Sequence, residues 1–137
     1  MIYPLPAVMV SCGATPEEYN IMTVSWTGTI CSDPPLCYIS VRPSRHSFKI
    51  IEKYGEFVIN LTTKSLAFAT DWCGVKSGAD TNKFEKMGLT PVPASMIRAP
   101  LIRESPVNIE CRVLEIKELG SHHMFISEVL AINADEE

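Results

Sequence analysis

The sequence predicts a mainly β protein with inserted helices, arranged as a small antiparallel Greek-key barrel of about six strands. Three observations support this fold class. Short segments rich in β-branched residues recur along the chain, bounded by proline, glycine and polar turns. Two long extended segments, residues 106–119 and 122–134, flank a Gly120-Ser121 turn. Helical patterns are confined to three short stretches between the strands.

The first half of the chain alternates strand patterns with polar turns. Strands are expected over residues 7–12, 21–26 and 35–41. The third begins at a Pro-Pro pair, because proline cannot donate to the middle of a sheet ladder. The residues between the second and third strands, TGTICSDP, indicate a polar loop.

A helix is predicted over residues 44–54, where Phe48, Ile51 and Tyr54 recur at helical spacing. Gly55 is a typical C-terminal stop for this helix, and the strand EFVINL follows it.

Two further helices are predicted in the second half of the chain. Thr62 or Thr63 can cap a helix through SLAFATDWC, which Gly74 closes. Asp80 can cap a shorter helix, TNKFEKM, which Gly88 closes.

The two long C-terminal segments indicate an antiparallel hairpin. Apolar residues alternate on one face from Val107 to Val113, and Leu114 and Ile116 then break the alternation. This break predicts a β-bulge.

Size and composition limit the function classes. The 137 residues are expected to form one domain, 1–137, and the formal charge of −4 argues against nucleic acid or an anionic membrane as partner. Five cysteines without a CxxC pair, together with no targeting segment, predict a cytoplasmic protein with free thiols. No apolar stretch is long enough to span a membrane.

The stretch RPSRHS predicts an anion site. It places Arg42, Ser44 and Ser47 where a strand leads into the first turn of a helix. Free backbone N–H groups and hydroxyl donors at a helix start suit a phosphate. The ordinary alternative is a serine cap beside solvated arginines.

Two other stretches offer polar groups to a ligand. The segment after the second strand carries Ser25, Thr27, Thr29 and Ser32, which suit the edge of a planar hydrogen-bonding ring, although polar loops of this kind are common. Ser77 and Lys83, in CGVKSGADTNKF, can reach an anion, but this signal is weak by itself.

The turn LGSHHMF brings two histidines together, and adjacent residues of a strand cannot both face the same side. No further ligands stand at metal-binding spacing, so we expect no metal site. The sequence also lacks a P-loop, a dinucleotide-binding glycine motif and a nucleophile elbow.

Taken in order, PAVMVSC, NIMTVSWTGTICSDPPLCYISVRPSRHSFKIIEKYGEFVIN, CGVKSGADTNKF and ELGSHHMFISEV resemble the flavin reductase-like family of FMN-binding split barrels, including its flavoredoxin branch. The resemblance covers most of the chain. It implies a six-stranded split β-barrel that forms a homodimer with FMN near the subunit interface. Ser121-His122 stands where the family usually has Gly-Asp, and the C-terminus is shorter than is typical of the family.

The resemblance also implies roles for individual residues. The isoalloxazine ring would lie along Ser25, Trp26, Thr27 and Thr29, with Cys31 and Ser32 close by. The phosphate would be held by Arg42, Ser44 and Ser47. A loop with Ser77, Gly78 and Lys83 would close over the phosphate or the nicotinamide. His123, or His122 in its place, would lie near the flavin, so that His123 and Cys31 are the expected catalytic residues.

The function implied is that of an FMN-binding oxidoreductase. It would pass electrons from NADH, NADPH or a redox protein partner through FMN to a flavin, a protein or a ferric acceptor. Cys31 and a histidine could hold ferric iron in a chelate, although a structural cysteine is the more common case. The alternative from a different class is a non-catalytic flavin-binding module, and NAD(P)H oxidation under turnover separates the two.

Overall fold

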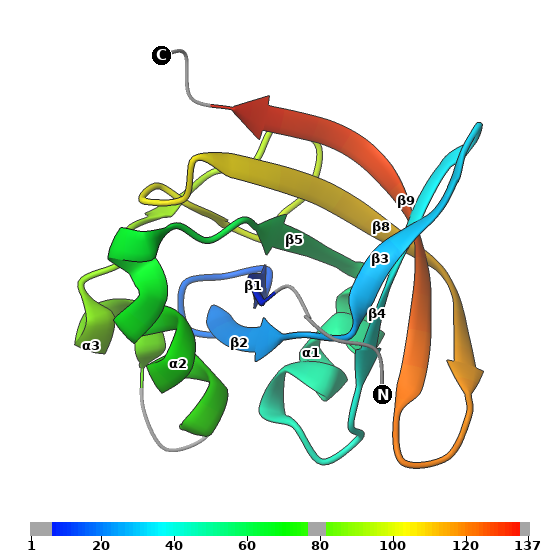
Figure 1. Cartoon of the computed structure of the whole chain (residues 1–137), viewed down its shortest axis with the longest axis horizontal. Helices are drawn as coiled ribbons and strands as arrows, with labels where there is room; N and C mark the ends of the chain where they lie inside the picture. Colours follow the sequence, from blue (N-terminus) through cyan, green and yellow to red (C-terminus); the bar gives the residue numbers. More distant parts are fainter. Residues whose placement is uncertain (1–6, 77–81, 135–137) are drawn as a thin grey trace.

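The main sheet contains seven antiparallel strands. The computed structural model describes residues 7–76 and 82–134. Within them the strands follow the spatial order β2-β1-β5-β8-β9-β4-β3, and β6 pairs with β7 in a small second sheet (Figure 1). The strands are β1 (Val8–Cys12), β2 (Asn20–Val24), β3 (Thr27–Ser32), β4 (Pro35–Val41), β5 (Glu56–Asn60), β6 (Pro91–Val92), β7 (Leu101–Ile102), β8 (Val107–Glu118) and β9 (His123–Ala134). The observed architecture is the predicted mainly β fold with inserted helices.

One strand of the main sheet departs from the prediction, and the small β6–β7 sheet was not predicted either. Residues Thr27–Ser32, expected as a polar loop, pair with β4 as strand β3, so the main sheet has seven strands where six were predicted. β3 lies at the edge of the sheet and none of its residues is buried. An exposed edge strand needs no alternation of apolar and polar residues. The polar sequence of β3 therefore gave no strand signal.

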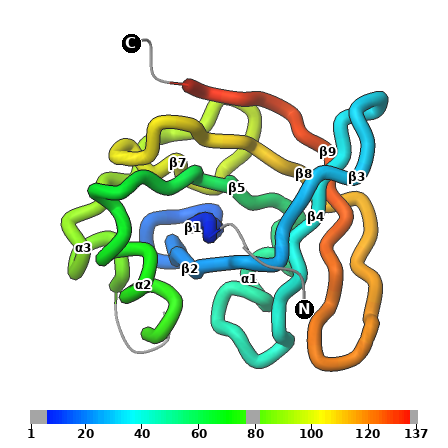
Figure 2. The backbone as a smooth tube through the Cα atoms, in the orientation of Figure 1, coloured from blue at the N-terminus to red at the C-terminus, as the bar shows by residue number. Residues whose placement is uncertain are grey.

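The helices lie on one side of the sheet's β1–β2 end, where α1 and α2 both contact β2 (Figure 2). They are α1 (His46–Tyr54), α2 (Ala67–Val75), α3 (Lys83–Met87) and the 3₁₀ turn η1 (Lys64–Leu66). The described residues contain no helix that is long and apolar enough to cross a membrane.

The predicted helix ends are partly confirmed. Gly55 and Gly88 adopt the left-handed conformation, with φ of 69° and 66°, and end α1 and α3. Gly74 does not end α2 but lies inside it, where a Cβ atom would come within 3.2 Å of Thr23 Cβ. The absence of a side chain at Gly74 therefore allows α2 to pack closely on β2.

The cap of the third helix differs from the expected one. Asp80, the expected cap, lies outside the described residues, and Asn82 caps α3 by accepting a hydrogen bond from Glu85 N.

The predicted C-terminal hairpin is confirmed. β8 and β9 pair along their length, and the register shifts between Val113 and Glu115, where the bulge was expected. A second shift lies between Glu110 and Cys111. These irregularities increase the twist of the long hairpin, which crosses the molecule in Figure 1.

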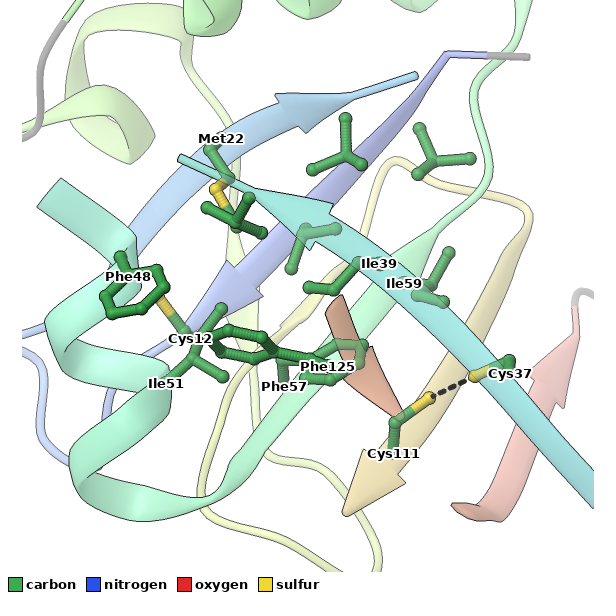
Figure 3. Packing of buried hydrophobic residues seen from close by; sticks show 14 residues of the cluster. Cys12, Met22, Cys37, Ile39, Phe48, Ile51, Phe57, Ile59, Cys111 and Phe125 are labelled. Carbon is green, nitrogen blue, oxygen red and sulfur yellow. Dashed lines mark hydrogen bonds between the residues drawn. The ribbon is translucent and has the colours of Figure 1, made fainter. Parts of the chain in front are cut away.

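The hydrophobic core fills the inside of the curved sheet. Phe57 and Phe125 pack at its centre with Ile39 and Ile51, so that β4, α1, β5 and β9 share one cluster (Figure 3). A second cluster, containing Met9, Ile21 and Phe84, joins α2 and α3 to β1 and β2. The two clusters hold the start of α1 and the end of α2 on the same part of β2.

Candidate functional site

A polar hollow of about 220 Å³ lies between the start of α1, the end of α2 and β2. We call it the cationic hollow. Its lining includes Asn20, Ser44, Arg45, His46, Ser47 and Lys83. Residues from three separate parts of the sequence therefore meet here, because α1, α2 and α3 all pack on β2.

Arg45 is the N-cap residue of α1, and its backbone is extended at this position. Its side chain makes no capping bond, and the first turn of α1 carries no acidic residue to offset the helix dipole. The Nη2 atom of Arg45 is buried without a hydrogen-bond acceptor among the described residues. Burial also lowers the pKa of the guanidinium group.

Lys83 brings a second cation into the same hollow. The residue is only 2% exposed, and its Nζ atom donates a hydrogen bond of 2.7 Å to the backbone oxygen of Cys73. The pKa of Lys83 is lowered to about 8, mainly by burial and to a smaller extent by the nearby charge of Arg45. No ion pair joins either cation to a carboxylate within residues 7–76 and 82–134. The positive charge of these two side chains makes the hollow suitable for binding an anion.

Ser47 forms the floor of this hollow. Its side chain is buried and its Oγ atom accepts a hydrogen bond of 2.7 Å from Asn20 Nδ2. That contact leaves the Ser47 hydroxyl hydrogen free to donate. Cys12 lies alongside, and burial raises the pKa of its thiol to about 12, so it remains protonated.

A neighbouring hollow of about 190 Å³ shares Met22 and Arg45 with the first. We call it the aromatic hollow. Trp26 and His122 lie against each other in its wall, with ring centroids 4.4 Å apart. Burial, followed by the nearby charge of Arg42, lowers the pKa of His122, which therefore favours the neutral imidazole.

The two hollows together suit an elongated ligand with an anionic end and a planar ring. Two cations and Ser47 can bind a phosphate at one end. Aromatic side chains and small polar groups line the other end. The described residues that line the two hollows include no nucleophile paired with a base. Within the described chain, no group of three His, Cys, Asp or Glu residues is arranged to hold a metal ion.

The structure separates the predicted site residues into two groups. Those lining the paired hollows are Ser25, Trp26, Arg42, Ser44, Ser47 and Lys83. Arg42 lies in the aromatic hollow, apart from the two serines with which the sequence grouped it. The residues lining a third, apolar cavity of about 470 Å³ are Thr27, Thr29, Cys31 and Ser32. Ser77 lies outside the described residues.

The two expected catalytic residues occupy different surroundings. Cys31 lines the apolar cavity, where its Sγ atom donates to the backbone oxygen of Pro34 at 3.1 Å. His123 packs edge-on against Phe48, with ring centroids 5.2 Å apart. His122, rather than His123, lies in the wall of the aromatic hollow.

Sequence reasoning missed Arg45 as a site residue. It stands between Ser44 and Ser47 in the stretch already singled out, so the signal was present. Arg42 was chosen instead because both arginines look alike in a sequence. Only the packing of α2 and α3 beside α1 shows which guanidinium is withdrawn from water.

The whole chain is similar to proteins of one family. The flavin reductase like domain matches residues 1–137. A protein of Pyrococcus abyssi is 34% identical over 137 residues, which cover all of this chain and 78% of that protein. The flavoredoxin of Desulfovibrio vulgaris (Miyazaki F) is 32% identical with a TM-score of 0.92, over 99% of this chain and 73% of the flavoredoxin.

A Shewanella frigidimarina protein, described as a flavin reductase with a split barrel domain, is 25% identical with a TM-score of 0.88. The match covers 96% of this chain and 68% of that structure. The predicted split-barrel fold is therefore confirmed.

Proposed function

Because the chain belongs to the flavin reductase-like family, we propose that the two adjoining hollows bind FMN and that the protein is an FMN-dependent oxidoreductase. When bound, the flavin supplies the electron chemistry, taking electrons from NAD(P)H or a protein donor and passing them to a flavin, protein or ferric acceptor. The protein's own residues bind and orient the cofactor.

One observation carries this proposal: the buried Nη2 atom of Arg45 has no acceptor among the described residues and lines the same hollow as the buried Lys83. A buried donor without an acceptor costs free energy, and such costs are retained where a ligand supplies the missing partner. A phosphate group offers three acceptor oxygens and a charge that opposes both cations. The cationic hollow therefore fits the phosphate of FMN.

The remaining roles follow from position. Ser44 and Ser47 would donate to the phosphate, and Trp26, Ser25 and His122 would hold the ring system in the aromatic hollow. A neutral His122 can donate or accept a hydrogen bond without adding charge beside the ring. The predicted ring contacts of Thr27, Thr29 and Ser32, and the loop contact of Ser77, stay predictions.

We favour FMN over FAD because a terminal phosphate monoester can enter a hollow of about 220 Å³ and face two cations at once. The phosphates of FAD are internal and carry an adenosine beyond them. Riboflavin, which lacks the phosphate, is the natural comparison ligand.

The first test is the visible absorption spectrum of the purified protein, with identification of any flavin released on denaturation. The flavin-free protein is then titrated with FMN and with riboflavin. We expect FMN to bind at least about tenfold more tightly, as one charge-assisted contact predicts. Equal affinities for FMN and riboflavin would show that the cationic hollow does not hold the phosphate.

Steady-state oxidation of NADH and NADPH tests the enzymatic part of the proposal. Free flavin, a ferric chelate and a small redox protein serve as acceptors in separate assays. FMN binding without oxidation of either nucleotide would assign the chain to the alternative class, a non-catalytic flavin-binding module.

We also retain the homodimer and the cytoplasmic location as proposals. The resemblance supports the dimer, and light scattering of the FMN-loaded protein tests it against the chain mass of 15.2 kDa. Five free cysteines favour a reducing compartment.

A further inference from the structure

Two cysteines on different strands meet in the core of the molecule. Cys37, on β4, and Cys111, on β8, approach to 3.6 Å between their Sγ atoms (Figure 3). They are 74 residues apart in the sequence. Cys12 and Cys31 instead donate to backbone oxygen atoms, those of Asn20 and Pro34. The Cys37–Cys111 pair therefore differs chemically from the remaining thiols.

The curvature of the sheet creates this contact. β9 lies between β4 and β8, and Cys37 stands opposite Ser127 while Cys111 stands opposite Val129. In a flat sheet, two strands separated by a third lie about 10 Å apart, too far for their sulfur atoms to touch. The register shift between Glu110 and Cys111 bends β8 at this point. Both thiols consequently turn into the same interior space.

The two thiols differ in access. Cys37 is 8% exposed and lines the apolar cavity of about 470 Å³, whereas Cys111 is 0% exposed and lies behind it. The cavity walls are mostly aliphatic, so a small uncharged molecule can enter more readily than a charged one. A disulfide would require the two sulfur atoms to close from 3.6 Å to about 2.05 Å.

The hydrogen bond between the thiols gives them different reactivities. The contact with Cys111 lowers the pKa of Cys37, although burial opposes this effect. The same contact, together with burial, raises the pKa of Cys111. The thiol that faces the cavity is thus the better nucleophile.

We propose that Cys37 and Cys111 form an oxidation site at which a small peroxide converts the two thiols into an internal disulfide. The Cys37 sulfur attacks one peroxide oxygen: an S–O bond forms, the O–O bond breaks and one water leaves. The Cys111 sulfur then attacks the resulting sulfenic acid: the S–S bond forms, the S–O bond breaks and a second water leaves. Two thiols lose two electrons in total, and one hydrogen peroxide molecule gains them.

The experiment uses the complete, fully reduced protein as purified, so that any association between copies is included. Hydrogen peroxide is added, the reaction is quenched with catalase, and the remaining thiols are alkylated under denaturing conditions. Non-reducing peptide mapping should show the Cys37 peptide linked to the Cys111 peptide, with a loss of about 2 Da per chain that dithiothreitol reverses. Free thiols at both positions after peroxide treatment, or a link between other cysteines, would overturn the proposal.

Matched variants assign the two roles. In Cys111→Ala the sulfenic acid of Cys37 should persist and react with dimedone, while in Cys37→Ala neither the link nor the adduct should form. Cys73→Ala is the control for a buried thiol outside the pair and should oxidise as the wild type does. If Cys111→Ala gives no adduct while the wild type still forms the link, Cys37 is not the attacking thiol. Peptide mapping of the wild-type protein decides the central point even where a core variant fails to fold, and it does not depend on flavin binding.

Discussion

Glu110 is a buried charged side chain and Arg45 is a half-buried one, and their surroundings differ. Glu110, on β8, is 0% exposed and accepts four hydrogen bonds, from the backbone and hydroxyl of Ser95, from Met96 N and from Asn133 Nδ2, at 2.7–3.0 Å. Arg45 keeps a buried nitrogen without an acceptor in the described chain.

We infer from this difference that the Glu110 carboxylate stabilises the fold, whereas the Arg45 guanidinium serves to bind a ligand. Burial raises the pKa of Glu110, but the hydrogen bonds from Ser95, Met96 and Asn133 lower it by more, so the carboxylate stays ionised. This site is complete, and it ties the segment between β6 and β7 to the main sheet. We propose that the Arg45 site is completed by a bound anion, which would supply the missing acceptor. Removing each charge should therefore have opposite effects on stability.

The largest effect is expected for Glu110→Ala. The substitution removes the acceptor from four donors, two of them backbone N–H groups. We expect it to lower the free energy of unfolding by about 3 kcal/mol, measured by urea denaturation. Glu115→Ala, on the same strand, is the control. It removes an exposed carboxylate paired with Lys117 at 3.3 Å and should leave the midpoint of urea denaturation unchanged. Equal losses in both variants would show that Glu110 is not a structural charge.

The next effect concerns affinity instead of stability. Arg45→Met should weaken FMN binding about 30-fold, as expected for the loss of a charge-assisted contact of about 2 kcal/mol. The free energy of unfolding without flavin should stay the same or rise, because the substitution removes a buried Nη2 atom that has no acceptor in the described part of the chain. Calorimetric titration and urea denaturation measure the two quantities. If Arg45→Met lowers the free energy of unfolding as much as Glu110→Ala does, Arg45 stabilises the fold and the proposed difference between the two residues is wrong.

Lys83 permits a smaller, pH-dependent test. Its folded pKa of about 8 lies below the model-peptide value of 10.5, so the unfolded chain holds this proton more tightly. The flavin-free protein should gain stability as the pH rises from about 8 towards 10.5, while FMN affinity should fall, because the protonated amine binds the phosphate. We expect a loss of about tenfold between about pH 7.5 and 9.5. The affinity of the wild type for riboflavin, and the affinity of Lys83→Met for FMN, should not change over this pH range.

The sequence predicted those parts of the fold where local pattern and tertiary environment agree. The β8–β9 hairpin, its bulge and the Gly55 stop of α1 each follow from alternation or from a glycine that local geometry requires. β3 was missed because an exposed edge strand carries no apolar pattern. Gly74 was misassigned because its role, close packing against Thr23, depends on a residue 51 positions away in the chain.

The candidate site was predicted by residue type but not by environment. Ser44, Ser47 and Lys83 were expected at an anion site, and the structure brings them together in the cationic hollow. The choice between Arg42 and Arg45 depends on which side chain α2 and α3 help to cover. Arg45 is half-buried whereas Arg42 is exposed, and this difference is a property of packing that spacing alone does not encode.

Arg42→Ala should give the smallest effect and serves as the control for Arg45. Arg42 is exposed, so its charge stays hydrated and screened, and we expect FMN affinity to fall no more than about threefold. The substitution should still be detectable at His122, because the charge of Arg42 is one of the two causes that lower the pKa of that imidazole. NMR titration should show the pKa of His122 rising in the variant, while burial continues to hold it below the usual value. A loss of FMN affinity as large as in Arg45→Met would reverse the assignment and return the phosphate contact to Arg42.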